Sequence, residues 1–144
     1  MNGQLFPNAH LVLAVLIFLV GFLIHWVGQI ISLIDWDLAV KIGICDINTT
    51  AEYKTYEKGI ATADALIGWT YGLAVVGLLL NQPWAYKLIW IPGVVFVYHG
   101  LSFWFWIGNQ VKLGNPTASP VMRFSWASLN LITGSLAIWM AWMA

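Results

Sequence analysis

Long apolar segments separated by short polar stretches are the dominant pattern in this chain. Four segments contain few charged residues, and each is long enough to cross a lipid bilayer as a helix, which takes about 20 residues. They cover residues 11–34, 60–80, 88–106 and 121–142. No repeat or linker divides the chain. The pattern therefore predicts an all-α integral membrane four-helix bundle that forms one domain over residues 1–144.

The stretch between the first two spans, residues 35–58, is the most polar part of the chain and holds five of its six acidic residues. Its first part, Trp36 to Ile44, is predicted to lie along the membrane interface, with Trp36, Leu38 and Val40 turned toward lipid. Further on, Thr49-Thr50-Ala51-Glu52 matches a capping box. The second helix is expected to begin there and to continue without a break into its span.

Turn and cap residues predict how the remaining helices are connected. Asn81-Gln82-Pro83-Trp84 predicts a tight turn, which makes the second and third helices antiparallel neighbours. Pro92-Gly93 predicts an irregularity or kink in the third helix, and Ser119-Pro120 predicts the N-cap and first residue of the fourth. One side of the fourth helix is expected to pack against other helices through Ala127, Asn130, Gly134, Ala137 and Ala141.

Four spans would place both termini on the same side of the membrane. Five of the six basic residues flank the two loops on the opposite side, and by the positive-inside rule this puts the termini outside the cytoplasm. The first loop is, however, richer in acids than in bases, so the side remains open. Asn48-Thr49-Thr50 also fits a glycosylation sequon, which would matter only in a secretory pathway.

Composition supports lipid as the solvent of most of the chain. Of the 144 residues, 60% are hydrophobic and 8% are charged, whereas soluble domains contain roughly 25% charged residues. The formal net charge is zero, which excludes nucleic acid as a partner and leaves membrane lipid. The ten tryptophans lie mostly near span ends, as in an aromatic belt. The single cysteine, Cys45, allows no internal disulfide and lacks the spacing of a metal motif.

Polar residues inside the spans gather at similar depth. At 1.5 Å per residue, His25, His99 and Asn130 lie about 2 to 4 Å from the middle of their spans, all toward the loop side. Asp64 and Ser102 are displaced the same way by roughly 7 to 9 Å. Asp64 is the only acid within an apolar span, and such residues are costly enough to mark functional sites. On its helix a continuous stripe is formed by Glu57, Ala61, Asp64, Gly68, Tyr71, Gly72 and Val75.

These residues favour a binding site for an apolar molecule, such as a lipid, a sterol or an aromatic compound, in the loop-side half of the bundle. Ligand pockets generally have apolar walls and a few convergent polar groups. The expected walls are Trp69, Tyr71, Trp90, Tyr98 and Phe103. The predicted ligand-binding residues are His25, Gln29, Asp64, Trp69, Tyr71, His99, Ser102 and Asn130. This main prediction involves no catalytic residue, metal or cofactor.

Several alternatives remain open. His25 and His99 could be the axial ligands of one b-type haem, although no haem-attachment motif is present. A histidine beside Asp64 could carry protons in a membrane isomerase, so that an enzyme is disfavoured but not excluded. The chain could instead be an accessory subunit of a larger membrane complex, or a homo-oligomer, that packs through its Gly and Ala stripes. Finally, the polar residues could simply hydrogen-bond between helices.

Two stretches, YKLIWIPGVVFVYHG (86–100) and ADALIGWTYG (63–72), resemble the small four-helix membrane proteins of the DoxX and BphX-like families. That resemblance implies a fold more than an activity. A fainter likeness to the emopamil-binding and sigma-two type of sterol-handling bundles rests on Asp64, Pro92 and His99. It would make Asp64 the acid that faces a sterol-like or cationic amphiphilic ligand. This chain has one intramembrane acid where those pockets tend to use two or more, unless Glu57 contributes.

Overall fold

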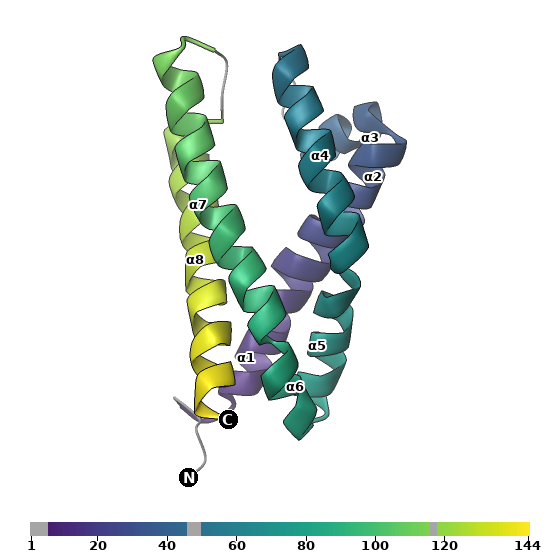
Figure 1. The fold of residues 1–144 in the computed structure, drawn as a ribbon, viewed down its shortest axis with the longest axis vertical. Coiled ribbons are helices and arrows are strands. Elements are labelled where there is room, and N and C mark those ends of the chain that lie inside the picture. The colour runs from purple at the N-terminus through teal and green to yellow at the C-terminus, as the bar shows by residue number, and fades with distance from the viewer. Residues whose placement is uncertain (1–5, 46–49, 116–117) are drawn as a thin grey trace.

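The computed structural model describes residues 6–45, 50–115 and 118–144, and these ranges contain helices and no strand (Figure 1). Among the described residues, three helices are long and apolar enough to cross a membrane: Ala9–Ile34, Pro83–Lys112 and Pro120–Met143. A bent pair, Ala51–Ile67 and Trp69–Leu79, makes a fourth candidate if it is counted as one span. The predicted all-α class and the apolar helices are confirmed.

The first helix is continuous from Ala9 to Ile34, but its hydrogen-bond pattern changes along its length. It consists of α1 (Ala9–Leu16), a π-helical segment η1 (Ile17–Gly28) and α2 (Gln29–Ile34). The π-helix, with its i→i+5 hydrogen bonds, is rare and is found often at functional sites. The segment η1 carries the buried His25.

The predicted interfacial segment forms a short helix, α3 (Trp36–Lys41), which begins where Asp35 accepts a hydrogen bond from the Leu38 backbone N–H at 2.9 Å. The expectation that Trp36, Leu38 and Val40 share one outward face is wrong. Alternate residues share a face in a strand, whereas a helix repeats every 3.6 residues. Leu38 is exposed, while Trp36 and Val40 are half-buried, and the Lys54 ammonium lies 4.9 Å from the Trp36 ring centroid.

The second helix, α4 (Ala51–Ile67), begins one residue later than the capping-box match predicts. Its N-cap is Thr50, whose hydroxyl accepts from the Tyr53 N–H at 3.2 Å. The capping-box match pairs Glu52 with Thr49, and Thr49 lies outside the described residues. The sequon residue Asn48 also lies outside them.

A break at Gly68 contradicts the prediction of an unbroken second helix. Helices α4 and α5 (Trp69–Leu79) meet there at 43°. The Tyr71 N–H donates to the Gly68 carbonyl at 3.0 Å, so the Ile67 carbonyl loses its helical donor and accepts from the Thr70 hydroxyl at 2.8 Å instead. Trp26 packs where a Gly68 side chain would be, since a Cβ on Gly68 would lie 2.2 Å from its ring. Glycine therefore lets the first helix approach closely enough to fix the bend.

The third helix consists of α6 (Pro83–Leu88) and α7 (Trp90–Lys112), with an interruption at Ile89. Pro92 has no N–H to donate to the Leu88 carbonyl, which accounts for an irregularity one turn before it. The predicted irregularity near Pro92-Gly93 is thus present. Gly93, however, has a packing role, because a Cβ there would lie 2.9 Å from Ile138 and 3.2 Å from the Gly134 carbonyl oxygen.

The fourth helix, α8 (Pro120–Met143), begins as predicted: Ser119 is its N-cap and accepts from the Met122 N–H at 3.2 Å, and Pro120 is its first residue. Its predicted packing side is buried at Ala127, Asn130, Gly134 and Ala137. Small residues on both helices bring α7 and α8 close together, as expected for helix contacts in membranes.

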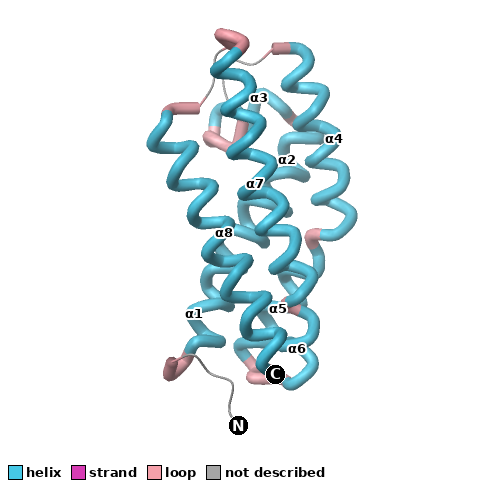
Figure 2. The backbone as a smooth tube through the Cα atoms, turned by 60° about the vertical axis from the view of Figure 1, so that its left-hand side comes forward, coloured by secondary structure: helices cyan, strands magenta, loops and turns pink. Residues whose placement is uncertain are grey.

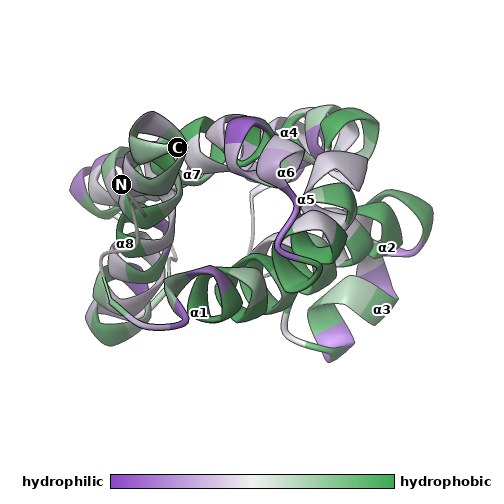
Figure 3. Cartoon of the chain, turned by 90° about the horizontal axis from the view of Figure 1, so that it is seen from below, coloured by the Kyte–Doolittle hydropathy of each residue, from purple (hydrophilic) through white to green (hydrophobic). Residues whose placement is uncertain are grey.

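The helices form two antiparallel pairs. The first helix packs against α4 and α5, whereas α6 and α7 pack against α8. The pairs contact each other near the end where α1 begins and α8 ends, and they diverge toward the end that carries the 35–58 and 108–119 connections (Figures 1 and 2). Viewed along the bundle, α7 and α8 lie on one side and α5 and α2 lie on the other (Figure 3).

Candidate functional site

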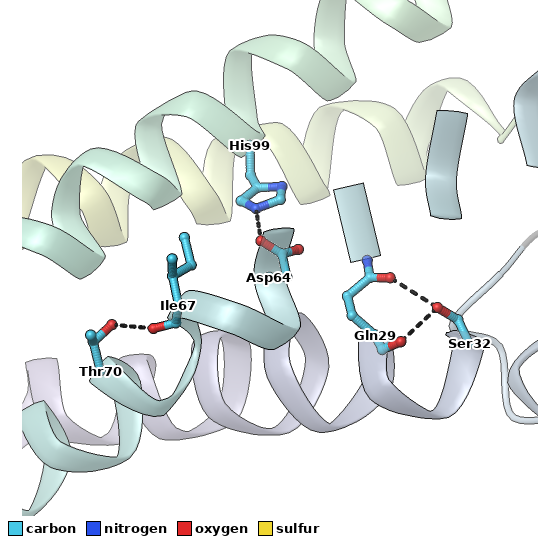
Figure 4. A network of polar contacts seen from close by, with 6 residues as sticks. All are labelled: Gln29, Ser32, Asp64, Ile67, Thr70 and His99. Carbon is cyan, nitrogen blue, oxygen red and sulfur yellow. Dashed lines mark hydrogen bonds and ion pairs between the residues drawn. The ribbon is translucent and has the colours of Figure 1, made fainter. Parts of the chain in front are cut away.

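Two histidines and one aspartate from three different helices meet between the pairs. His99 Nε2 of α7 lies 2.9 Å from Asp64 Oδ1 of α4, the distance of a hydrogen bond (Figure 4). The His25 ring of η1 lies against the His99 ring, with 4.2 Å between ring centroids and 84° between planes. One donor atom of each residue lies within 4.8 Å of the other two. The predicted depth layer of His25, His99 and Asp64 is thus a physical cluster.

Aromatic side chains hold His25 in place. Trp126 of α8 stacks on the imidazole at 5.4 Å and 19°, and Phe96 of α7 meets it edge-on at 5.5 Å. Tyr71 of α5 lies 6.2 Å away, also edge-on, and fills the space left by Gly21 of the first helix. The orientation of the imidazole is therefore set by all four helices.

Several polar atoms of the cluster are buried without hydrogen bonds. Within the described ranges, neither ring nitrogen of His25 has a hydrogen-bond partner, nor does Asp64 Oδ2. The two residues are 3% and 2% exposed. Asn130, which is fully buried beside His25, donates to the Trp126 carbonyl at 2.9 Å, but its own Oδ1 has no partner in the described structure. Unsatisfied buried polar atoms are destabilising by about 1–3 kcal/mol each, so each of them requires an explanation.

Two adjoining cavities open from the cluster toward the loop side. The smaller, of about 110 Å³, is lined by His25, Gln29, Glu57, His99 and Ser102, among others. The larger, of about 450 Å³, is more apolar, and it has Ile42, Ala118 and Met122 in its wall. Both cavities are lined by Ile24, Ile44, Tyr53, Phe103 and Trp126. The polar group thus lies at one end of a mainly apolar space.

Most of the predicted polar residues lie at this site. His25, His99, Gln29 and Ser102 line the smaller cavity, and Asp64 lies directly behind His99. Gln29 also accepts from the Ser32 hydroxyl, through both its backbone oxygen at 2.8 Å and its side-chain oxygen at 3.1 Å (Figure 4). Asn130 lies behind His25 and away from the cavity lining.

Most of the predicted aromatic walls lie elsewhere. Trp69, Trp90 and Tyr98 are 54%, 44% and 53% exposed and face outward. Helix geometry explains this, because a residue turns by about 100° per position and Trp90 falls on the face opposite His99. Tyr71 is buried in the core beneath the cluster and lines neither cavity, whereas Phe103 lines both.

Other wall residues are missing from the sequence prediction. Tyr56 of α4 stacks on Trp106 of α7 at 4.3 Å and 11°, which joins the two helix pairs across the smaller cavity. Extending the stripe of the second helix by one turn beyond Glu57 would have included Tyr53. Similarly, Trp126 is four residues before Asn130 and therefore on the same side of its helix.

The arrangement does not fit a haem between His25 and His99. Two axial imidazoles lie on opposite faces of a porphyrin plane, whereas these two rings are in edge contact with each other. The donor set is instead of the kind that holds a single metal ion: two imidazoles and a carboxylate.

No family model matches the chain, and no curated protein or solved structure matches it. The resemblances to the DoxX, BphX-like and sterol-handling bundles therefore gain no support from these comparisons, and function is argued from the site alone.

Proposed function

We propose that the chain is a multi-pass membrane protein that crosses the bilayer four times, with α4 and α5 together forming the second, bent span. Large apolar side chains are exposed on all four candidate spans, among them Ile34, Leu66, Phe105 and Trp142. Such a surface would aggregate in water and is stable in lipid.

The number of spans has a direct test. Four spans put both termini on the same side, whereas three put them on opposite sides. Reporter fusions at the N- and C-termini should therefore give the same compartment. Opposite compartments would contradict the four-span topology. The positive-inside prediction adds that both reporters should lie outside the cytoplasm.

For function, we propose that the protein binds an amphiphilic ligand with a mainly apolar body, such as a sterol, a lipid or a hydrophobic amine. The observation that carries the proposal is the pair of adjoining cavities that ends at the His25, Asp64 and His99 cluster. The larger cavity, at about 450 Å³, falls in the size range of ligand sites, and the polar residues His25, His99 and Ser102 line the smaller cavity beside it.

Each part of the cavity suits one part of such a ligand. Ile24, Phe103 and Trp126 would contact the apolar body. His99 and Ser102 would hydrogen-bond the polar head, and Asp64 would orient the His99 ring and balance a positive charge. Because both cavities lie between the two helix pairs, a ligand could enter without separating either closely packed pair.

Photoaffinity labelling tests this proposal. The purified full-length chain in mild detergent would be incubated with a diazirine sterol or with a diazirine-bearing long-chain amine, and labelled peptides would be mapped. We expect labels near Phe103 and Trp126. We expect Asp64→Asn and His99→Ala to lower labelling about tenfold, the effect of losing a charged hydrogen bond. Unchanged labelling in both variants would remove these residues from the site.

A matched pair of variants separates cavity blocking from a general effect of added bulk. Ser102→Phe should fill the smaller cavity and reduce labelling, since Ser102 lines it. Ser135→Phe adds the same side chain on the exposed side of α8 and should leave labelling unchanged. Equal labelling of the two variants would contradict the proposed location.

Acid–base chemistry on the bound ligand is a second candidate, and the 2.9 Å contact between His99 and Asp64 is the observation that favours it. A histidine paired with a carboxylate can remove and return a proton, as isomerisation of a double bond requires. Solvent deuterium should then enter a sterol substrate in the presence of the protein but not of Asp64→Asn. If the parent chain incorporates no more deuterium than Asp64→Asn does, this role is refuted.

The accessory-subunit role is the competing proposal, because an apolar outer surface serves a protein partner as well as lipid. Native mass spectrometry after extraction in mild detergent distinguishes the two. A partner or a second copy bound in fixed ratio would support a subunit or a homo-oligomer. A single chain that still binds the sterol probe would support the ligand-binding role.

A further inference from the structure

We propose that His25, Asp64 and His99 bind one divalent transition-metal ion between the two helix pairs. Two imidazoles and one carboxylate are the donors that zinc and iron(II) accept, and three protein ligands leave room for water or a small ligand. The residues come from η1, α4 and α7, so the ion would tie three helices together. Metal binding does not depend on ligand binding, but it uses the same His99 and Asp64, so a bound ion would take the place of a cationic ligand head at that carboxylate.

The distances suit a small ion after a modest adjustment. At metal–ligand bonds of about 2.1 Å, neighbouring donor atoms of a six-coordinate ion lie about 3 Å apart and opposite ones about 4.2 Å. His99 Nε2 and Asp64 Oδ1 already lie 2.9 Å apart. The widest separation within the set is at most 4.8 Å, so it exceeds the spacing of two opposite donors by about 0.6 Å or less. If His25 belongs to the widest pair, its ring would have to shift against its contacts with Trp126 and Phe96.

Buried polar atoms without hydrogen-bond partners support the metal site independently of the distances. His25 is 3% exposed, and within the described structure neither of its ring nitrogens is hydrogen-bonded. Asp64 is 2% exposed, and its Oδ2 has no hydrogen-bond partner among the described residues. An imidazole lone pair and a carboxylate in an apolar interior are both stabilised by a cation. A bound metal would thus satisfy the atoms that the polypeptide leaves without partners.

The surroundings supply what a metal site needs beyond its ligands. Asn130 lies beside His25, where its side-chain oxygen can accept the second ring N–H and orient the imidazole. The smaller cavity, which reaches both histidines, has space for water and gives access from the loop side. Cys45 lies outside the donor set, and a site without thiolate favours zinc, iron(II), cobalt(II) or manganese(II) over copper(I).

Cobalt(II) is the probe for the test, because its visible absorption reports coordination directly. The full-length chain would be purified without a polyhistidine tag, stripped with EDTA and titrated with cobalt(II) in detergent, followed by displacement with zinc(II). We expect one equivalent to bind, with absorption bands that disappear as zinc enters. Absence of saturable binding near one equivalent would overturn the proposal.

Variants assign the ligands. His25→Gln, His99→Gln and Asp64→Asn should each weaken cobalt binding at least tenfold, since even a residue that only supports a ligand is worth about 10–100-fold. His10→Gln removes the remaining histidine of the chain, which lies outside the cluster, and should leave binding unchanged. A loss in His10→Gln equal to that in His25→Gln would overturn the assignment.

Two further measurements keep the test decisive. If a variant fails to fold, as judged by size-exclusion chromatography, X-ray absorption of the zinc-loaded parent chain still tests the ligands. It should show two imidazoles with oxygen, and sulfur ligation would refute the site. Labelling by the sterol probe is measured separately in the metal-free chain. A failure of metal binding would therefore not contradict the proposed ligand site, and a failure of labelling would not contradict the metal site.

Discussion

The substitution Gly134→Ala should separate the closely packed helices α7 and α8. A Cβ on Gly134 would lie 2.7 Å from the Gly93 carbonyl oxygen, 2.8 Å from Val97 Cγ2 and 3.0 Å from Phe96 Cβ. Real Cβ atoms essentially never come closer than 3.0 Å to another heavy atom, so the Gly93 contact alone requires a movement of at least 3.0 − 2.7, or 0.3 Å. The atoms in the way are backbone or close to it, and therefore the helices themselves must move.

The expected magnitude follows from two opposing effects. Overpacking a tight interface is destabilising by about 1–3 kcal/mol. Replacing glycine by alanine within a helix is stabilising by about 0.5–1 kcal/mol, because the unfolded chain loses freedom. We therefore expect Gly134→Ala to lower the free energy of unfolding by about 0–2.5 kcal/mol, and by about 1–3 kcal/mol relative to a glycine-to-alanine change without the clash.

Gly59→Ala is the matched control. Gly59 lies in α4, and a Cβ there meets no atom within 4 Å among the described residues, so only the helix-propensity effect remains. It should raise the free energy of unfolding by about 0.5–1 kcal/mol. Both variants would be unfolded by SDS titration in mixed micelles and followed by circular dichroism. If Gly134→Ala is as stable as Gly59→Ala, the inferred close contact between α7 and α8 is wrong.

Three smaller predictions use the same unfolding assay. Thr70→Val removes the hydroxyl that donates to Ile67 at the bend and should lower the free energy of unfolding by about 1 kcal/mol. Asn81→Ala, at a φ of 49°, should lower it by about 1–2 kcal/mol, and Asn81→Gly by less. Trp26→Phe loses the indole hydrogen bond to the Ala65 carbonyl, about 1 kcal/mol, whereas Trp26→Ala also empties the space at Gly68 and should lose about 3–5 kcal/mol.

Hydropathy alone predicts the helices well, because lipid requires about 20 apolar residues in each span and leaves few other solutions. The cap at Ser119 was also readable, since a serine before proline has a local role that tertiary packing rarely overrides. The break at Gly68 could not be predicted in this way. Glycine is common in membrane helices without bending them, and here the bend is packed against Trp26, which lies far away in the sequence.

Depth along each span brought His25, Asp64 and His99 to the same level, and the structure places them in contact. The depth of a residue along its span, however, does not say where it lies around the helix axis. That angular position decides which residues face the cavity. Trp90 and Trp69 have suitable chemistry and depth but point outward. The π-helical segment η1 adds to the difficulty, because a face calculated at 3.6 residues per turn does not hold through it.

The division into two helix pairs has a consequence for the order of assembly. Each pair is an antiparallel hairpin of neighbouring helices, and such local contacts form early. His25 and Asp64 belong to one hairpin and His99 to the other. Neither hairpin alone can therefore complete the cluster, which comes into existence only when the two dock. Contact between His99 and Asp64 is thus expected only once the two hairpins have docked, and a site-specific signal from this pair would distinguish docked from undocked hairpins.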